Sequence, residues 1–517
     1  MSTQTVDAVY YDPYKPEITT DPYPVFRRLR EEAPLYYNEE FDFYAVSRFD
    51  DVERGLNDRE TYSSGRGAIL EIIKSGAEFP PGVLIFEDPP VHTMHRNLLQ
   101  RLFTPKRMNA LEARIHRICA QCLDPLSRSA GFDLIEDYGA HMPMRVIGEL
   151  LGIPEQDHGS VRDRVDQSLR TEVGKPMAFN ESNYTGEGFE EYIDWRAKHP
   201  ADDVMTELMN AEFKDETGIT RKLTREEILT MVNVLAGAGN ETTTRLIGWT
   251  GKVLAEHPEQ RRMIAEDLSL IPQAIEEILR FEPPAPHMAR YVTRDVELYG
   301  RGVPKGSVMM FLPGSANRDD RRFTDGDRFD IRREPRPHLS FGYGIHACIG
   351  RVLARLEGRV ALEALIRRFP NWEVDYGNAR LSPTSTVRGW ETMPIFTGSA
   401  SRPAASAAAA AQPGAAAGPF TIDGTWKVTV KGPTGPQSTT LTIAHDKGVV
   451  TGSQSGQGES SPILDGKLDG NQLSWINQIS KPMKMKLTFT AEIENNAMTG
   501  KVKAGFMGSF PFTGVKD

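Results

Sequence analysis

The sequence changes character abruptly near residue 398, and this change constrains the fold more than any other feature. Residues 399–419, SASRPAASAAAAAQPGAAAGP, consist almost entirely of Ala, Pro, Gly and Ser, with neither a charged nor an apolar face. Repeated Pro and Gly predict a disordered or semi-rigid tether rather than a packed helix. We therefore expect a large domain over residues 1–398, a linker over 399–419 and a small domain over 420–517.

The large domain has the patterns of a mainly α protein with minor β structure. Apolar residues recur at three- and four-residue spacing, and charged residues occupy the opposite faces. Short stretches at 42–47 and 308–312 resemble strands. The predicted helices include residues 107–126, 225–257, 258–281 and 350–369.

The small domain reads as strands separated by turns. Stretches rich in Val, Thr and Ile alternate with turns that contain Gly and Asn. Predicted strands include residues 426–430, 439–444 and 485–493. The pattern predicts an all-β meander, closed as a barrel or packed as a sandwich.

Composition narrows the class of protein. The net charge of −10 over 517 residues argues against a nucleic-acid-binding role. The polar N-terminal residues predict neither a secretory signal nor a membrane anchor. Three cysteines, Cys119, Cys122 and Cys348, provide no disulfide framework and too few ligands for a four-Cys zinc or iron–sulfur site. We expect a cytoplasmic protein.

Cys348 lies in the run Phe341-Gly-Tyr-Gly-Ile-His-Ala-Cys-Ile-Gly350, directly before a predicted helix. A single thiolate framed by glycines is suited to hold a haem iron by sulfur. The first-turn amides and the helix dipole would favour the thiolate. The alternative is that Cys348 is simply a small buried hydrophobic residue.

This decapeptide resembles the haem-binding signature of the cytochrome P450 family, Phe-x-x-Gly-x-His/Arg-x-Cys-x-Gly, at every fixed position. The resemblance extends over about residues 20–398 and leaves the small domain outside. It implies the P450 fold with haem b (iron protoporphyrin IX) bound through Cys348. It also implies a monooxygenase that inserts one oxygen atom of dioxygen into a hydrophobic small molecule.

A second motif, Glu277-Ile-Leu-Arg280, matches the Glu-x-x-Arg of the same family. Taken alone, an i, i+3 pair of this kind is commonly a surface ion pair. In the family it is buried, joined by a third arginine, and structural rather than catalytic. Arg328 matches that third position.

A third motif, Ala238-Gly-Asn-Glu-Thr-Thr243, falls midway through the predicted helix 225–257. In the family this segment crosses above the haem, where a distortion of the helix makes room for dioxygen and an acid–alcohol pair delivers protons. Glu241 and Thr242 occupy the positions of that pair. The structural alternative is that the small residues 236–239 allow close packing of two helices.

Four further residues match haem-propionate ligands of the family: His92, Arg96, Arg290 and His346. His92 and Arg96 are i, i+4 neighbours on one predicted helical face. Two buried propionates need several charge-assisted donors, which is consistent with this set.

The family positions also suggest a largely apolar substrate pocket. Arg66, His287 and Arg388 are the polar groups that could pair with a substrate carboxylate or hydroxyl. The expected pocket residues are Ile69, Leu70, Leu235, Ala238, Pro286, His287, Met288 and Val387.

The electrons must come from another protein, because the small domain is too short for a flavodoxin-like reductase and contains no cysteine. We expect a separate ferredoxin with its NAD(P)H-dependent reductase, docking on a basic patch. The candidate patch consists of Arg101, Lys106, Arg107, Arg351 and Arg355.

A second hypothesis is a haem-binding sensor or carrier without oxygenase activity, whose β domain is the output or a ligand-binding module. The Glu241–Thr242 pair favours the enzyme.

Overall fold

The computed structural model of the chain describes residues 9–178, 180–384, 386–397, 422–432, 435–446, 449–456, 459–469, 472–479, 485–494, 497–504 and 509–516. The chain divides into two compact units, residues 1–404 and 405–517. The expected linker over 399–419 lies outside the described residues. Within the described part of the chain, no helix combines the length and apolar character needed to cross a membrane.

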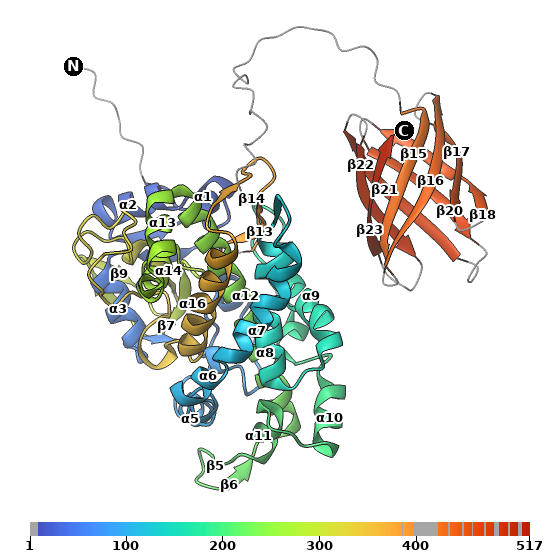
Figure 1. Cartoon of the computed structure of the whole chain (residues 1–517). Helices are drawn as coiled ribbons and strands as arrows, with labels where there is room; N and C mark the ends of the chain where they lie inside the picture. The colour runs from blue at the N-terminus through green and yellow to red at the C-terminus, as the bar shows by residue number, and fades with distance from the viewer. Residues whose placement is uncertain are drawn as a thin grey trace, which may run out of the picture. The chain divides into compact units, whose positions relative to one another are not determined.

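Helix α12 (Arg225–Glu256) runs through the first unit and organises it. Its start is fixed by a capping box, in which Thr224 Oγ1 accepts from the Glu227 amide and Glu227 Oε2 accepts from the Thr224 amide. Several helices pack directly against it (Figure 1), and the most extensive contacts come from two helices before it and two after it in the sequence. They are α8 (Met142–Leu151), α9 (His158–Leu169), α14 (Ile271–Phe281) and α16 (Arg351–Arg368).

The predicted helices 225–257 and 350–369 are confirmed as α12 and α16, whereas the other two are interrupted. Residues 258–281 form α13 (Pro258–Glu266), a short turn and α14. Pro272 in the first turn of α14 lacks an amide proton, so a new helix begins there. Residues 107–126 are split between α6 (Pro105–Ala110) and α7 (Glu112–Leu123).

The remaining helices of the first unit are shorter and lie mostly in its N-terminal half and beside α12. They are α1 (Pro16–Thr20), α2 (Tyr23–Glu32), α3 (Phe49–Asn57), α4 (Leu70–Ser75), α5 (Val91–Leu102), α10 (Glu190–Lys198), α11 (Val204–Asn210) and α15 (Pro313–Ala316).

One five-stranded sheet accompanies the helices, in the order β1-β2-β10-β7-β3. β10 is parallel to β2, and the other neighbours are antiparallel. The predicted strands 42–47 and 308–312 are confirmed as β2 and β10. The strands are β1 (Leu35–Asn38), β2 (Phe43–Val46), β3 (Tyr62–Ser63), β7 (Met288–Val292) and β10 (Val308–Phe311).

Smaller sheets make up the rest of the β structure in this unit. One is a three-stranded sheet that consists, in order, of β11 (Trp372–Val374), β14 (Pro394–Thr397) and β4 (Gly131–Asp133). The two-stranded pairs are β5 (Glu212–Lys214) with β6 (Thr220–Lys222), β8 (Val296–Leu298) with β9 (Arg301–Val303), and β12 (Arg380–Leu381) with β13 (Trp390–Thr392).

The second unit is a closed antiparallel barrel (Figure 1). Strands that follow one another in sequence are paired, except β18 and β19, and β23 returns to pair with β15. β18 and β19 both pair with β17 and meet at Ile463, so together they fill one of eight strand positions. The strands are β15 (Gly424–Gly432), β16 (Gly435–Asp446), β17 (Val449–Gly456), β18 (Glu459–Pro462), β19 (Leu464–Asp469), β20 (Gln472–Ile479), β21 (Met485–Glu494), β22 (Ala497–Ala504) and β23 (Ser509–Lys516).

The barrel has a hydrophobic core of its own. Trp475 stacks on Phe489 with ring centroids 4.6 Å apart. The Trp475 indole N–H donates to Gln454 Oε1 at 3.1 Å and to Asn477 Oδ1 at 2.9 Å, so the buried polar groups are paired. Of the two predicted architectures, barrel or sandwich, the structure has the barrel.

Candidate active site

The loop that carries Cys348 is bent by two glycines in the left-handed region, Gly342 (φ 65°) and Gly344 (φ 68°). The Cys348 amide donates to the Phe341 carbonyl at 2.8 Å, which closes the loop just before α16 begins at Arg351. A Cβ atom at Gly344 would lie 2.8 Å from the Leu56 carbonyl oxygen. Glycine is therefore required there both by backbone conformation and by close packing.

The same loop borders open space. A Cβ atom added at Gly342 or Gly350 would meet no described protein atom closer than 3.8 Å. Cys348 is a free thiol whose pKa is raised by burial, while the Gly350 amide and Arg96 act in the opposite direction. A metal ion that binds the sulfur would displace this proton.

Four side chains able to carry positive charge gather near this loop. His92 and Arg96 come from α5, Arg290 from β7, and His346 from the loop itself. The rings of His92 and His346 lie with their centroids 4.3 Å apart, and Arg96 donates to the Ala347 carbonyl. Neither ring nitrogen of His92 has a hydrogen-bond partner among the residues that the structure describes.

The pKa values of this cluster indicate that an anion would stabilise it. Burial, reinforced by neighbouring cations, lowers the pKa of His92 to about 4 and that of His346 to about 2. Burial likewise lowers the pKa of Arg290 to about 10. Burial thus opposes a positive charge on each of these side chains, and a dianionic group beside the open loop would stabilise the charged form of all four. The residues present therefore fit a haem, whose two propionates are such a group.

Glu241 and Thr242 lie on different faces of α12. Thr242 is half-buried, and its hydroxyl donates to the Ala238 carbonyl at 2.9 Å. Glu241 is 3% exposed and accepts from Arg245 Nη2 at 2.6 Å. α12 is helical throughout its length in this structure, so the distortion implied by the resemblance is not seen.

The small residues of this motif also serve helix packing. A Cβ atom at Gly239 would lie 2.8 Å from the Ile147 side chain of α8, so α8 approaches closely at this point. The structural alternative for Gly239 is therefore supported, and it is compatible with the acid–alcohol pair because Gly239 faces α8.

Sequence reasoning missed two residues beside Glu241. Arg245 follows it by four residues and forms its ion pair, a spacing that the sequence displays. Asp166, on α9, accepts from the Asn240 side-chain amide at 3.4 Å, and no feature of the sequence indicates this contact.

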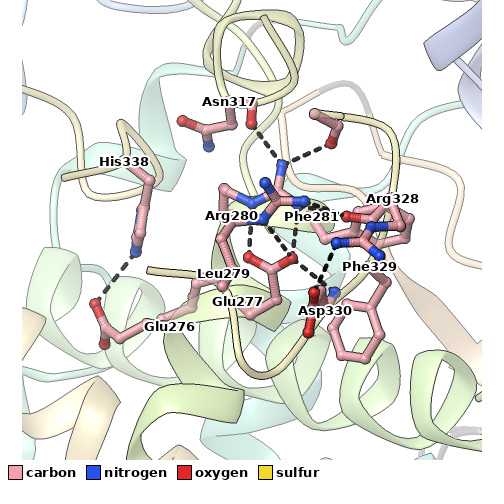
Figure 2. Close-up of polar contacts among 12 residues, drawn as sticks. Glu276, Glu277, Leu279, Arg280, Phe281, Asn317, Arg328, Phe329, Asp330 and His338 are labelled. Atoms are coloured by element: carbon pink, nitrogen blue, oxygen red, sulfur yellow. Dashed lines mark hydrogen bonds and ion pairs between the residues drawn. The ribbon is translucent and has the colours of Figure 1, made fainter. Parts of the chain in front are cut away.

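The Glu277–Arg280 pair is buried on α14, with both side chains under 5% exposed. Its two hydrogen bonds are each 2.7 Å long, and Arg280 Nη1 also donates to the Asn317 carbonyl at 2.8 Å (Figure 2). The buried pair therefore connects α14 to the loop after α15 through hydrogen bonds that water does not compete for.

The prediction that Arg328 completes this cluster was wrong. The Arg328 side chain is 65% exposed and pairs with Asp330, and only its backbone carbonyl accepts from Arg280. Arg333 is the third arginine, with Nε 3.1 Å from Glu277 Oε1. The turn over residues 325–333 directs the Arg333 side chain inward and that of Arg328 to solvent.

A cavity of about 150 Å³ contains three of the eight predicted pocket residues, Pro286, His287 and Val387. Its other walls come from the N-terminal segment around Tyr14, from residues 171 and 173–175, and from residues 381–384 and 386–389. Arg388 also lines it, but forms an ion pair with Glu282 at 2.6 Å and donates to two backbone carbonyls. It is therefore not available to a substrate carboxylate.

The other five predicted pocket residues do not line this cavity. Ile69 packs with Ile72, Val83 and Phe86 in an apolar cluster that α12 joins through Val234. Leu70 packs on the N-terminal segment and Leu235 in the helical core. Ala238 lies on the open side of α12, and Met288 reaches toward Gly342.

Comparison with known proteins agrees with this geometry. The family model described as Cytochrome P450 matches residues 184–389. The chain is 38% identical over 390 residues to the putative cytochrome P450 123 of Mycobacterium tuberculosis, covering 74% of this chain and 96% of that protein.

Two solved structures are also similar. The chain is 30% identical to CYP109E1 from Bacillus megaterium in complex with testosterone, with a TM-score of 0.67 over 74% of this chain and 99% of that chain. It is 27% identical to P450BioI in complex with a hexadec-9Z-enoic acid-ligated acyl carrier protein, with a TM-score of 0.65 over 74% and 100% of the two chains. The chain belongs to the cytochrome P450 family.

Proposed function

We propose that this P450 monooxygenase carries haem b on Cys348 and oxidises a hydrophobic small molecule with electrons from a separate ferredoxin and its NAD(P)H-dependent reductase. The observation that carries this proposal is the gathering of His92, Arg96, Arg290 and His346, among them two buried arginines, beside the open loop of Cys348. When bound, the haem supplies the iron that activates dioxygen, and thiolate ligation promotes O–O cleavage.

The chain's own residues would bind and orient the haem. His92, Arg96, Arg290 and His346 would hold the propionates, and the added negative charge would raise the pKa values that burial lowers. The two arginines are 6–9% exposed, so these charge-assisted bonds would form where water competes little.

Glu241 and Thr242 would deliver the protons that the reaction consumes. The Thr242 hydroxyl donates its proton to the Ala238 carbonyl. The hydroxyl oxygen is therefore free to accept a hydrogen bond from a water or a reacting group. Glu241 is held by Arg245 at the adjoining turn of α12, from which it could release a proton toward Thr242.

The substrate is proposed to be largely apolar. Ile18, Phe26, Pro286 and Val387 contribute apolar surface to the 150 Å³ cavity, and its Arg388 is already paired. Testosterone in one relative and a fatty acyl chain in another are hydrophobic ligands of different shape. They are therefore suitable probes of the apolar site.

The redox partner would dock on exposed basic residues near Cys348. Two of the five candidates are engaged within the chain, because Arg107 pairs with Glu207 and Arg355 with Glu276. Arg101, Lys106 and Arg351 are exposed and remain the candidate patch. Three free thiols are consistent with the proposed location in a reducing cytoplasm.

The proposal is tested by the spectrum of the haem-reconstituted protein under carbon monoxide. The reduced wild-type protein should have the red-shifted Soret band of a thiolate-ligated ferrous carbonyl complex, and Cys348→Ser should lose it. Cys119→Ser is the matched control and should keep the band. An unchanged spectrum in Cys348→Ser would refute the assignment of the ligand.

Turnover separates the monooxygenase from a sensor or carrier. With a surrogate ferredoxin and reductase, testosterone or hexadec-9Z-enoic acid should shift the Soret band and yield a hydroxylated product. A protein with the thiolate spectrum but no product across a panel of lipophilic compounds would favour the sensor, which family membership and the Glu241–Thr242 pair do not favour.

A further inference from the structure

A second cavity, of about 50 Å³, lies against the face of α12 that carries Glu241. Its walls include Asp166 and Arg170 from the end of α9, Asn240 and Arg245 from α12, and Glu391 from β13. The volume exceeds the roughly 30 Å³ that a water molecule occupies in the liquid, and the walls are polar. The cavity is therefore suited to hold water beside the catalytic carboxylate.

The charges around this cavity do not balance unless one carboxyl is protonated. Glu241 pairs with Arg245, and Glu391 pairs with Arg170. Asp166 then has no cationic partner in contact among the described residues. Arg162, the other nearby cation on α9, directs its guanidinium to Asp163 and to the His141 ring instead.

Asp166 and Glu241 are also close enough to interact directly. Burial, together with the hydrogen bond and charge of Glu241, raises the pKa of Asp166 to about 8. Two carboxyls in one site share a proton because both cannot ionise at low cost. The Asn240 amide donates to Asp166 Oδ1, which fixes that oxygen on the side of α12. Asn240 Oδ1 itself is buried without a partner in the described part of the chain.

We propose that Asp166 shares one proton with Glu241 and that this carboxyl pair, fed by water in the second cavity, is the route by which protons reach the active site. The inference rests on the proposed function. Each turnover takes two electrons from the reductase and two protons from solvent, reduces one oxygen atom of dioxygen to water and places the other in the substrate.

In this scheme Asp166 is a positioning residue that acts through Glu241. Each proton enters through the cavity, passes from Asp166 to Glu241 and leaves Glu241 on the side of Thr242. The Asp166 carboxylate then takes the next proton from cavity water, so the pair returns to its starting state after each transfer.

The first test is a titration that needs no substrate. Infrared difference spectra of the ferric, haem-loaded protein should contain the band of a protonated carboxyl that disappears as the pH rises through about 8. Asp166→Asn should lose this titration. Glu155→Gln is the matched control, because it removes the same charge at an exposed position just before α9, and it should keep the titration.

The second test follows oxygen reduction by the substrate-free enzyme with a surrogate ferredoxin and reductase. Asp166→Asn should release more of the consumed oxygen as hydrogen peroxide and should raise the solvent isotope effect on oxygen consumption. Asp166→Glu, which restores a carboxyl, should recover the wild-type values, and the Glu155→Gln control should retain them.

An Asp166→Asn protein with an unchanged carboxyl titration, or with unchanged peroxide yield and isotope effect, would overturn the inference. Such a result is distinguishable from failure of the proposed function. If the proposed function failed, the wild-type protein itself would lack the thiolate spectrum under carbon monoxide.

Discussion

Arg333 donates from Nε to Glu277 Oε1 at 3.1 Å, although 56 residues separate them. The same side chain donates to the carbonyls of Thr324, Asp325 and Arg328. Arg333 thus connects the buried Glu277–Arg280 pair to the loop that follows α15, whereas Arg328 contributes to that connection only its backbone.

This arrangement predicts different costs for two arginine substitutions. Arg333→Ala should lower the free energy of unfolding by about 1–3 kcal/mol, because it leaves a buried carboxylate oxygen and three carbonyls with fewer donors. Arg328→Ala, at a side chain 65% exposed, should change it by less than about 0.5 kcal/mol. Urea unfolding of both variants checks this. Equal effects would contradict the assignment.

A buried histidine should make stability fall at alkaline pH. His95 Nδ1 lies 2.8 Å from Glu87 Oε1, and its Nε2 lies 3.7 Å from Glu227 Oε1. Burial opposes protonation, but hydrogen bonds to Glu227 and Glu87 prevail and raise the pKa of His95 from 6.5 to about 9.

The pKa of His95 is higher in the folded protein than in the unfolded chain. The stabilisation that the protonated ring contributes is therefore fully present below about pH 6.5 and is lost as the pH rises through about 9. The loss should be about 3 kcal/mol. The free energy of unfolding of His95→Gln should not show this decline between pH 6 and about 9.5. His116→Gln, at an exposed position on α7, is the control and should decline like the wild type.

The cationic cluster should determine how tightly haem is kept. Arg290→Gln removes a donor that is 6% exposed, and should weaken haem binding about 10- to 100-fold, measured by transfer to apomyoglobin. Arg294→Gln removes the same charge four residues later, where the side chain is 61% exposed, and should leave transfer unchanged. Similar behaviour of the two variants would argue against propionate binding by Arg290.

The 150 Å³ cavity should be where a hydrophobic ligand enters or binds. Val387→Trp would fill part of it and should weaken the Soret shift caused by the ligand at least about tenfold, while the carbon monoxide spectrum stays unchanged. Ile219→Trp, at a position 63% exposed, serves as the control. An undiminished shift in Val387→Trp would place the ligand elsewhere.

The two units should fold independently, because each has its own hydrophobic core. A protein ending at Thr397 should keep the carbon monoxide spectrum and turnover with purified redox partners. Residues 420–517 alone should give one cooperative unfolding transition, followed by the fluorescence of buried Trp475. Lost turnover in the truncated protein would give the barrel a part in catalysis.

Local patterns were sufficient for much of the fold and for the haem-binding loop. The periodicity of 225–257 and 350–369 predicted α12 and α16, because an amphipathic pattern and a cap such as Thr224 act within one helix. Gly342 and Gly344 likewise reflect a backbone requirement confined to the loop itself.

Contacts between distant segments were decided by the tertiary structure alone. Arg328 and Arg333 belong to one polar loop, and only its path past α14 determines which side chain faces Glu277. Closure of the barrel depends on β23 pairing with β15, an edge-to-edge match that alternation within a strand does not encode. Asp166 and Glu241 share a site because α9 packs on α12, and the free energy of that packing comes from the apolar faces of the helices rather than from the two carboxyls.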